Sequence, residues 1–64
     1  MTTKERALAA LMEERGYTTG LVQTALLLLG GSRELLDELI AFVAETDASE
    51  DDVVGRLATL CGTH

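Results

Sequence analysis

The sequence predicts an all-α protein, a small bundle of four short helices. Apolar residues recur at the i, i+3, i+4, i+7 spacing of an amphipathic helix in each of four segments. Hydrophobic residues make up 47% of the chain and proline is absent, which favours packed helices over a disordered chain. Glycines and capping residues separate the four segments. With 64 residues the chain has room for one domain, residues 1–64.

The first helix is predicted over residues 3–15. Thr2 and Glu5 have the spacing of a capping box, in which a hydroxyl and a carboxylate each accept a hydrogen bond from an amide that has no partner within the helix. Gly16 is expected to end this helix in the left-handed conformation of a Schellman motif. The apolar stripe of the helix consists of Leu8, Leu11 and Met12.

The stretch from Thr18 to Glu45 predicts two more helices, separated by Gly30-Gly31 and capped at their starts by Thr18 and Ser32. When the first half of this stretch is moved forward by fourteen positions, its apolar residues coincide with those of the second half. We therefore expect a helical hairpin that is closed face to face. Leu27 lies outside the apolar arc, so it is either an isolated surface leucine or part of a binding surface.

A fourth helix is predicted over residues 50–61. Ser49 and Asp52 have the spacing of a second capping box, and the acidic residues at the start of this helix complement its positive end. Gly55 in its interior weakens the helix unless a neighbouring backbone needs the space. The residues expected to point inward are Val53, Val54, Leu57, Leu60 and Cys61.

The charge of the chain argues against several classes of partner. A net charge of -6 repels the phosphates of nucleic acids and of anionic lipids, so we expect no nucleic acid and no membrane partner. The N-terminal segment lacks the pattern of a signal peptide. Cys61 is the single cysteine, which excludes an intrachain disulfide and favours a reducing, cytoplasmic setting.

The sequence contains no recognisable catalytic or metal-binding motif. Cys61 and His64 could pair in name only, because nucleophilic catalysis needs both side chains held in place by a third group. A zinc site needs three or four His or Cys ligands, and the chain has two such residues. We therefore expect a protein that is not an enzyme and that uses no cofactor and no metal.

Residues 8–45 resemble a ubiquitin-associated domain. That family has a Met-Gly-Phe or Met-Gly-Tyr loop, followed at fixed spacing by a small apolar residue, an Ala-Leu pair, a Gly-Asn-type turn and a glutamate. The corresponding residues here are Gly16-Tyr17, Val22, Ala25-Leu26, Gly30-Gly31-Ser32 and Glu34. The resemblance implies a three-helix core that binds another protein, typically ubiquitin, through the glycine loop and the end of the third helix.

Carried over by position, the contacts with that partner would be Gly16 and Tyr17, together with Leu39 and Ile40. Two departures bear on this implication. Arg15 stands where the family has methionine, which removes an apolar contact. The fourth helix is additional to the family's fold, and it raises the question of whether the binding surface is covered.

A second, shorter resemblance concerns Ser32. The segment from Gly30 to Leu35 is similar to the modified-serine site of acyl carrier proteins, with Gly31 in place of the aspartate and Arg33 in place of the leucine. The other interpretation of Ser32 is a plain helix cap.

Three functional hypotheses follow. The first is a protein–protein interaction module that binds an apolar patch on a partner through Gly16, Tyr17, Leu27, Leu39 and Ile40. The second is a structural homodimer, in which apolar surface around Leu27, Leu28 and the fourth helix packs against a second copy. The third, an acyl-carrier-like protein, depends on Ser32.

Overall fold

The computed structural model describes residues 2–62, which form four α-helices and no strand. The helices are α1 (Thr3–Glu14), α2 (Thr19–Leu29), α3 (Arg33–Glu45) and α4 (Glu50–Gly62). The predicted all-α bundle of four short helices is thus confirmed. The boundaries differ by one residue at two ends, because Arg15 is the C-terminal cap of α1 and α4 continues past Cys61.

Capping boxes begin two of the helices, as predicted. At the start of α1, the Thr2 amide donates to Oε1 of Glu5 at 2.7 Å and the Glu5 amide donates to Oγ1 of Thr2 at 3.2 Å. At the start of α4, the Ser49 amide donates to Oδ2 of Asp52 at 3.1 Å and the Asp52 amide donates to Oγ of Ser49 at 3.2 Å. These bonds satisfy amides that have no partner within the helix, and they locate both helix starts.

The loop after α1 has the predicted Schellman geometry. Gly16 has a φ of 90°, in the left-handed region that glycine adopts without steric cost. Its amide donates to the carbonyl of Glu13 at 3.1 Å, and the amide of Tyr17 donates to the carbonyl of Met12 at 3.1 Å. The chain therefore reverses within a few residues and sends α2 back along α1.

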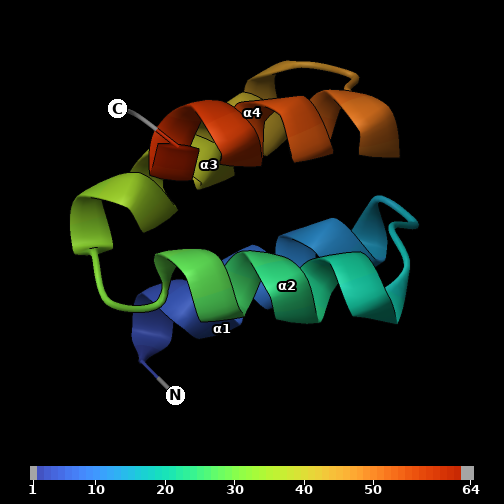
Figure 1. Ribbon diagram of the computed structural model, residues 1–64. Helices are drawn as coiled ribbons and strands as arrows, with labels where there is room; N and C mark the ends of the chain where they lie inside the picture. The colour runs from blue at the N-terminus through green and yellow to red at the C-terminus, as the bar shows by residue number, and fades with distance from the viewer. Residues whose placement is uncertain (1, 63–64) are drawn as a thin grey trace.

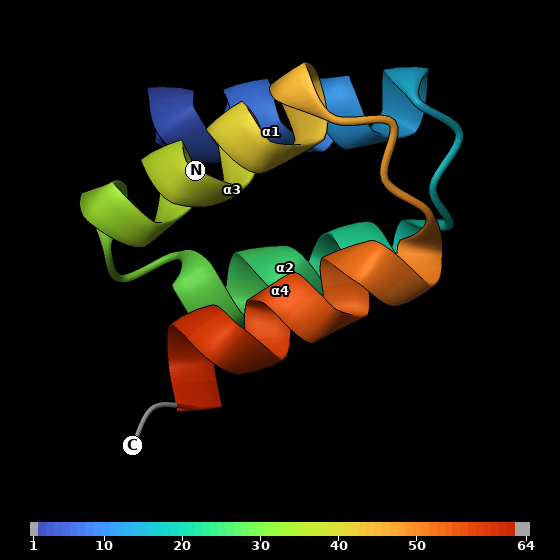
Figure 2. The same cartoon turned by 90° about the horizontal axis from the view of Figure 1, so that it is seen from above.

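The four helices occupy the corners of a square bundle (Figures 1 and 2). In Figure 2, α1 and α3 lie side by side in one layer, and α2 and α4 lie side by side in the other. The two helices of each layer run in the same direction, and the layers run in opposite directions. Consecutive helices consequently alternate between the layers.

This arrangement corrects the expected face-to-face hairpin of α2 and α3. The two helices are diagonal neighbours with little mutual contact, whereas α3 packs chiefly against α1, and α2 packs against both α1 and α4. The fourteen-residue repeat shows that each helix has a buried side. The repeat does not specify which helix packs against that side. In the structure, α1 packs against the buried sides of both α2 and α3.

The core lies at the centre of the square and receives side chains from every helix. Burying one such side chain contributes about 1.5–3 kcal/mol relative to leaving it exposed. The buried hydrophobic residues are Leu8, Met12, Val22, Ala25, Leu29, Leu36, Leu39, Val43, Val53 and Leu57.

Two residues of α4 that were expected to point inward do not. Val54 is 53% exposed and Cys61 is exposed, so their predicted burial is wrong. Val53 and Leu57 already fill the side of α4 that faces the core. A residue next to Val53 in sequence is rotated by about 100° around the helix, which places Val54 on the flank.

Candidate functional site

The five residues predicted to contact a partner do not form one exposed surface. Leu39 is fully buried in the core, so its assignment as a surface contact is corrected. Ile40 is half-buried and packs against the core, as does Tyr17. Gly16 is exposed in its loop, and Leu27 is 85% exposed on α2. Leu39 belongs to the same stripe of α3 as the buried Leu36 and Val43, and this stripe faces the core.

Hydrogen bonds join the loop between α1 and α2 to the end of α3, to the loop that follows it and to the start of α4. The hydroxyl of Tyr17 donates to the carbonyl of Ala48 at 2.5 Å. Arg15 donates from Nη2 to the carbonyl of Ala44 at 3.1 Å, near the C-terminal end of α3. The amide of Thr18 donates to Oε2 of Glu50 at 2.7 Å. The loop that the family resemblance assigns to a partner is therefore engaged within the molecule.

Thr18 and Glu50 also align α2 with α4 at the ends where both helices begin. At the opposite ends, Sγ of Cys61 lies 4.0 Å from the carbonyl oxygen of Leu28, within reach of a weak hydrogen bond. The two contacts join residues 32 and 33 positions apart in the chain. Because the two offsets differ by only one position, the parallel helices lie nearly in register along their length.

This register brings together an apolar surface on the outer side of α2 and α4, which we name the α2/α4 face. On α2, residues 21, 24 and 28 follow one flank of the helix, and on α4, residues 54, 58 and 61 follow the flank that adjoins it. Leu28 is 51% exposed and Val54 is 53% exposed. The α2/α4 face consists of Leu21, Thr24, Leu28, Val54, Ala58 and Cys61.

The six residues of the α2/α4 face are uncharged, and the exposed Asp51, three positions before Val54 on the same side of α4, borders the face at one end. The chain has no charged residue between Arg15 and Arg33, and none in residues 57–62. The charged residues of α4 lie in its first half, at Glu50, Asp51, Asp52 and Arg56. By contrast, the layer of α1 and α3 carries charged side chains and an ion pair, in which Nζ of Lys4 is 2.5 Å from Oδ1 of Asp37. Charged side chains are therefore concentrated on α1, on α3 and in the first half of α4, whereas α2 carries none.

Two members of this face, Val54 and Cys61, were missed by sequence reasoning, because both belong to an apolar stripe and were interpreted as core positions. Leu28 was named as part of an apolar surface in the homodimer hypothesis, but not among the residues that contact a partner protein. The signal that could have identified the face is the run of seventeen uncharged residues from 16 to 32. A surface helix of a soluble protein usually carries charges on its outer side, so a helix without any is unusual.

Leu27 lies outside the α2/α4 face, on the outer crest of α2. It borders a shallow hollow of about 350 Å³ that is also lined by Glu5, Gln23 and Leu26. Its exposed side chain extends the apolar area of α2 toward α1.

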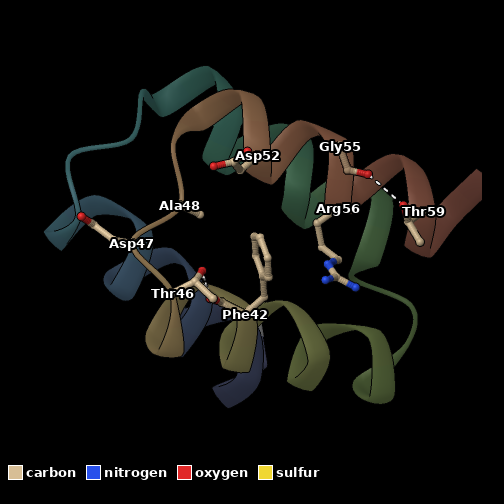
Figure 3. Close-up of a pocket in the computed structure, with 8 residues that line it drawn as sticks. All are labelled: Phe42, Thr46, Asp47, Ala48, Asp52, Gly55, Arg56 and Thr59. Carbon is tan, nitrogen blue, oxygen red and sulfur yellow. Dashed lines mark hydrogen bonds between the residues drawn. The ribbon is translucent and has the colours of Figure 1, made fainter.

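A groove of about 450 Å³ lies between α3 and α4, on the other flank of α4 (Figure 3). Arg56 lies over the ring of Phe42, with Cζ 4.7 Å from the ring centroid, in cation–π geometry. The hydroxyl of Thr46 donates to the carbonyl of Phe42, and that of Thr59 donates to the carbonyl of Gly55. The Thr46 hydroxyl is therefore engaged at the C-terminal cap of α3 and the Thr59 hydroxyl within α4, and the eight lining residues form no nucleophile–base pair.

Ser32, the residue of the acyl-carrier resemblance, caps α3. Its Oγ accepts a hydrogen bond from the amide of Leu35 at 3.3 Å. This is the role that the capping interpretation predicts. His64, the partner of Cys61 in the nominal Cys-His pair, lies outside the described residues.

Comparisons of the chain with models of protein families, with curated proteins and with solved structures gave no match. Among residues 2–62, no group of three His, Cys, Asp or Glu side chains is arranged to hold a metal ion. None of the helices in this part of the chain is long and apolar enough to cross a membrane.

Proposed function

We propose that this protein is a non-enzymatic protein–protein interaction module that binds an apolar patch on a partner through the α2/α4 face. The observation that carries the proposal is the exposure of Leu28 and Val54 on a surface without charged residues. Apolar surface left exposed on one side of a small soluble protein is the usual mark of an interaction site.

The proposal differs in its surface from the one implied by the ubiquitin-associated resemblance. The side chains of Tyr17 and Arg15 donate hydrogen bonds to the carbonyls of Ala48 and Ala44. The glycine loop therefore has fewer free polar groups for a partner protein than the resemblance implies. The left-handed conformation of Gly16, in the turn between α1 and α2, supports the resemblance of this loop to that of a ubiquitin-associated domain. A single cysteine supports a cytoplasmic setting.

The proposal is tested by site-specific photo-crosslinking in living cells. A photoreactive residue is placed at Thr24, which is exposed in the middle of the α2/α4 face, or at Glu38, which is exposed on α3 as the matched control. We expect covalent adducts of higher mass from position 24 and none from position 38. Adding Leu28→Glu to the position 24 variant should abolish these adducts, because burying an unpaired carboxylate against the partner protein costs much free energy.

Absence of adducts from position 24, or equal labelling from both positions, would overturn the proposal. Circular dichroism of each variant establishes that the helices are retained, so that a lost adduct reports on the surface and not on unfolding.

A further inference from the structure

We infer that the groove between α3 and α4 is a second binding site, which holds an extended segment of a partner protein that carries a basic and an acidic residue two positions apart. The groove lies on the other flank of α4 from the α2/α4 face, so this site goes beyond the proposed function. Three features of the groove support the inference: the separation of its charges, the free donors of Arg56 and the open space at Gly55.

Charge is separated along the groove. Figure 3 shows Asp47 and Asp52 toward one end and Arg56 toward the other, with the ring of Phe42 between them. The side of α4 that lines the groove presents residues at helical spacing, namely Asp52, Gly55, Arg56 and Thr59. The groove is therefore negative at one end and positive at the other, and it suits a ligand with the opposite arrangement of charge.

Arg56 is held in the groove without an acidic partner. Its guanidinium lies over the ring of Phe42, with Cζ 4.7 Å from the centroid. Asp52 is four positions earlier on the same helix, where an acid commonly pairs with an arginine, but Arg56 forms no ion pair within residues 2–62. A guanidinium that contacts a ring through its face keeps the N–H groups at its edge for a carboxylate. Arg56 is thus a carboxylate-binding group that is already positioned.

Gly55 leaves open space between the two charges. Glycine weakens the interior of a helix relative to alanine, and no neighbouring group requires it here, because a Cβ would contact nothing within 4 Å. The space is in the wall of the groove, between Asp52 and Arg56. A ligand backbone can approach a helix most closely where no side chain projects. Packing within the bundle does not explain Gly55, whereas a ligand that crosses the groove does.

The spacing of the charges selects an extended segment. Asp52 and Arg56 are four positions apart, which is about 6 Å along α4. Residues two positions apart in an extended chain are separated by about 6.6 Å and point to the same side. A basic side chain therefore reaches Asp52 while an acidic one reaches Arg56, and the backbone between them passes Gly55. A free amino acid cannot do this, because its ammonium and carboxylate are attached to one carbon.

The hydroxyls of the groove suit a peptide backbone. Thr46 donates to the carbonyl of Phe42 and Thr59 donates to the carbonyl of Gly55, so each hydroxyl can only accept hydrogen bonds from a ligand. The amides of an extended segment are donors without a partner of their own. Both threonines thus provide acceptors for the backbone of the segment.

The test is an NMR titration of the whole chain with five-residue peptides that are acetylated and amidated at their ends. Two probes, Ala-Lys-Ala-Glu-Ala and Ala-Glu-Ala-Lys-Ala, have the inferred spacing in either chain direction. The control, Ala-Lys-Glu-Ala-Ala, has the same composition, but an extended chain points its two charges to opposite sides. We expect saturating shifts of the Gly55 amide and the Phe42 ring with at least one probe, and binding of the control that is several-fold weaker.

A double-mutant cycle tests the contact with Arg56. Arg56→Gln should raise the dissociation constant of the better probe by at least about threefold, which is the range of a partly exposed ion pair. It should have no further effect on the same peptide with glutamine in place of glutamate, because the interaction is then already absent. Arg6→Gln removes the same charge at an exposed position of α1, and it should leave binding unchanged.

Gly55→Ala tests the open space. The added methyl group should stabilise α4 and raise the melting temperature, but it should also raise the dissociation constant of the probe by at least about threefold. A purely structural role of Gly55 would not give these opposite effects. Gly20→Ala is the matched control on α2, where a Cβ also contacts nothing within 4 Å, and it should not change binding.

Two results would overturn the inference. One is the absence of saturating shifts at Gly55 and Phe42 with either probe, and the other is a Gly55→Ala variant that binds the probe as the parent does. The proposed function fails by a different measurement, because neither Thr24 nor Glu38, the positions of the photoreactive residue, lines the groove.

Discussion

The hydroxyl of Tyr17 donates a hydrogen bond to the backbone carbonyl of Ala48 across 2.5 Å, and the two residues are 31 positions apart in the chain. The bond joins the loop after α1 to the loop before α4, at the end of the bundle where both loops lie (Figure 2). Arg15 and Thr18, on either side of Tyr17, donate to Ala44 and Glu50 across the same junction. Hydrogen bonds from the loop after α1 to α3, to Ala48 and to α4 therefore hold this end of the bundle together.

Tyr17→Phe keeps the ring in place and removes only the hydroxyl. We expect the free energy of unfolding to fall by about 1 kcal/mol, the usual net value of one partly buried hydrogen bond. Urea denaturation of the variant and the parent measures the difference. Thr59→Val is the matched control, because its hydroxyl bonds to Gly55 within its own exposed helix, and it should change stability by less than about 0.5 kcal/mol. Equal losses of unfolding free energy in the two variants would show that the hydrogen bond from Tyr17 to Ala48 stabilises the protein no more than the bond within α4.

Gly16→Ala tests the left-handed turn. A side chain at a φ of 90° clashes with the following backbone, so we expect a loss of about 1–2 kcal/mol in the free energy of unfolding. Gly31→Ala is the control in the other glycine turn, because Gly31 does not have a positive φ and an added Cβ would contact nothing within 4 Å. The control should show no loss. Denaturation of both variants under the same conditions provides the comparison, and an unstrained Gly16→Ala would contradict the geometry of the loop.

The limits of the helices were predictable from sequence because local chemistry determines them. Thr2, Thr18, Ser32 and Ser49 each place an oxygen near amides that have no partner within their helix, and these bonds span only three residues. Gly16 supplies a conformation that other residues avoid. None of this depends on the rest of the fold, so each position could be assigned from its neighbours alone.

The pairing of helices was not predictable in the same way. An apolar stripe shows that a helix has a buried side, and the stripes of α1, α2 and α3 are interchangeable in this respect. The same limitation affects the site. Leu39 and Leu28 both belong to apolar stripes, yet Leu39 is fully buried and Leu28 is half exposed. The difference is set by the corner of the bundle that each helix occupies, which depends on contacts between distant segments.

The capping box of α1 makes stability depend on pH through Glu5. The hydrogen bond from the amide of Thr2 stabilises the ionised carboxylate and lowers the pKa of Glu5 below its ordinary value of 4.5. A group whose pKa is lower in the folded state contributes stability above its unfolded pKa. That contribution is lost as the pH falls through the folded pKa.

We therefore expect the parent protein to lose stability relative to Glu5→Gln as the pH is lowered from 7 to about 3. The difference between the two proteins should be constant near neutral pH and should narrow below pH 4.5. Thermal unfolding across this range measures it, and an NMR titration of the Glu5 carboxyl measures the pKa directly. A pKa at or above 4.5 would contradict the capping-box account.

Gly55 offers a substitution that should stabilise the protein. It lies in the interior of α4, where glycine costs about 1 kcal/mol relative to alanine because it loses more backbone freedom on folding. The sequence left open that a neighbouring backbone needs the space, but a Cβ at this position would contact nothing within 4 Å. The cost of glycine is thus not offset by a close approach. Gly55→Ala should raise the free energy of unfolding by about 1 kcal/mol.

The reverse substitution at an exposed position of another helix is the control. Ala41→Gly in α3 should lower the free energy of unfolding by a similar amount, because it introduces the same backbone freedom without removing a buried group. Urea denaturation at a single low protein concentration keeps self-association constant between the variants. A destabilising Gly55→Ala, with Ala41→Gly behaving as expected, would contradict this prediction. It would mean that the groove between α3 and α4, which Phe42 and Arg56 also line, has no room for a methyl group at residue 55.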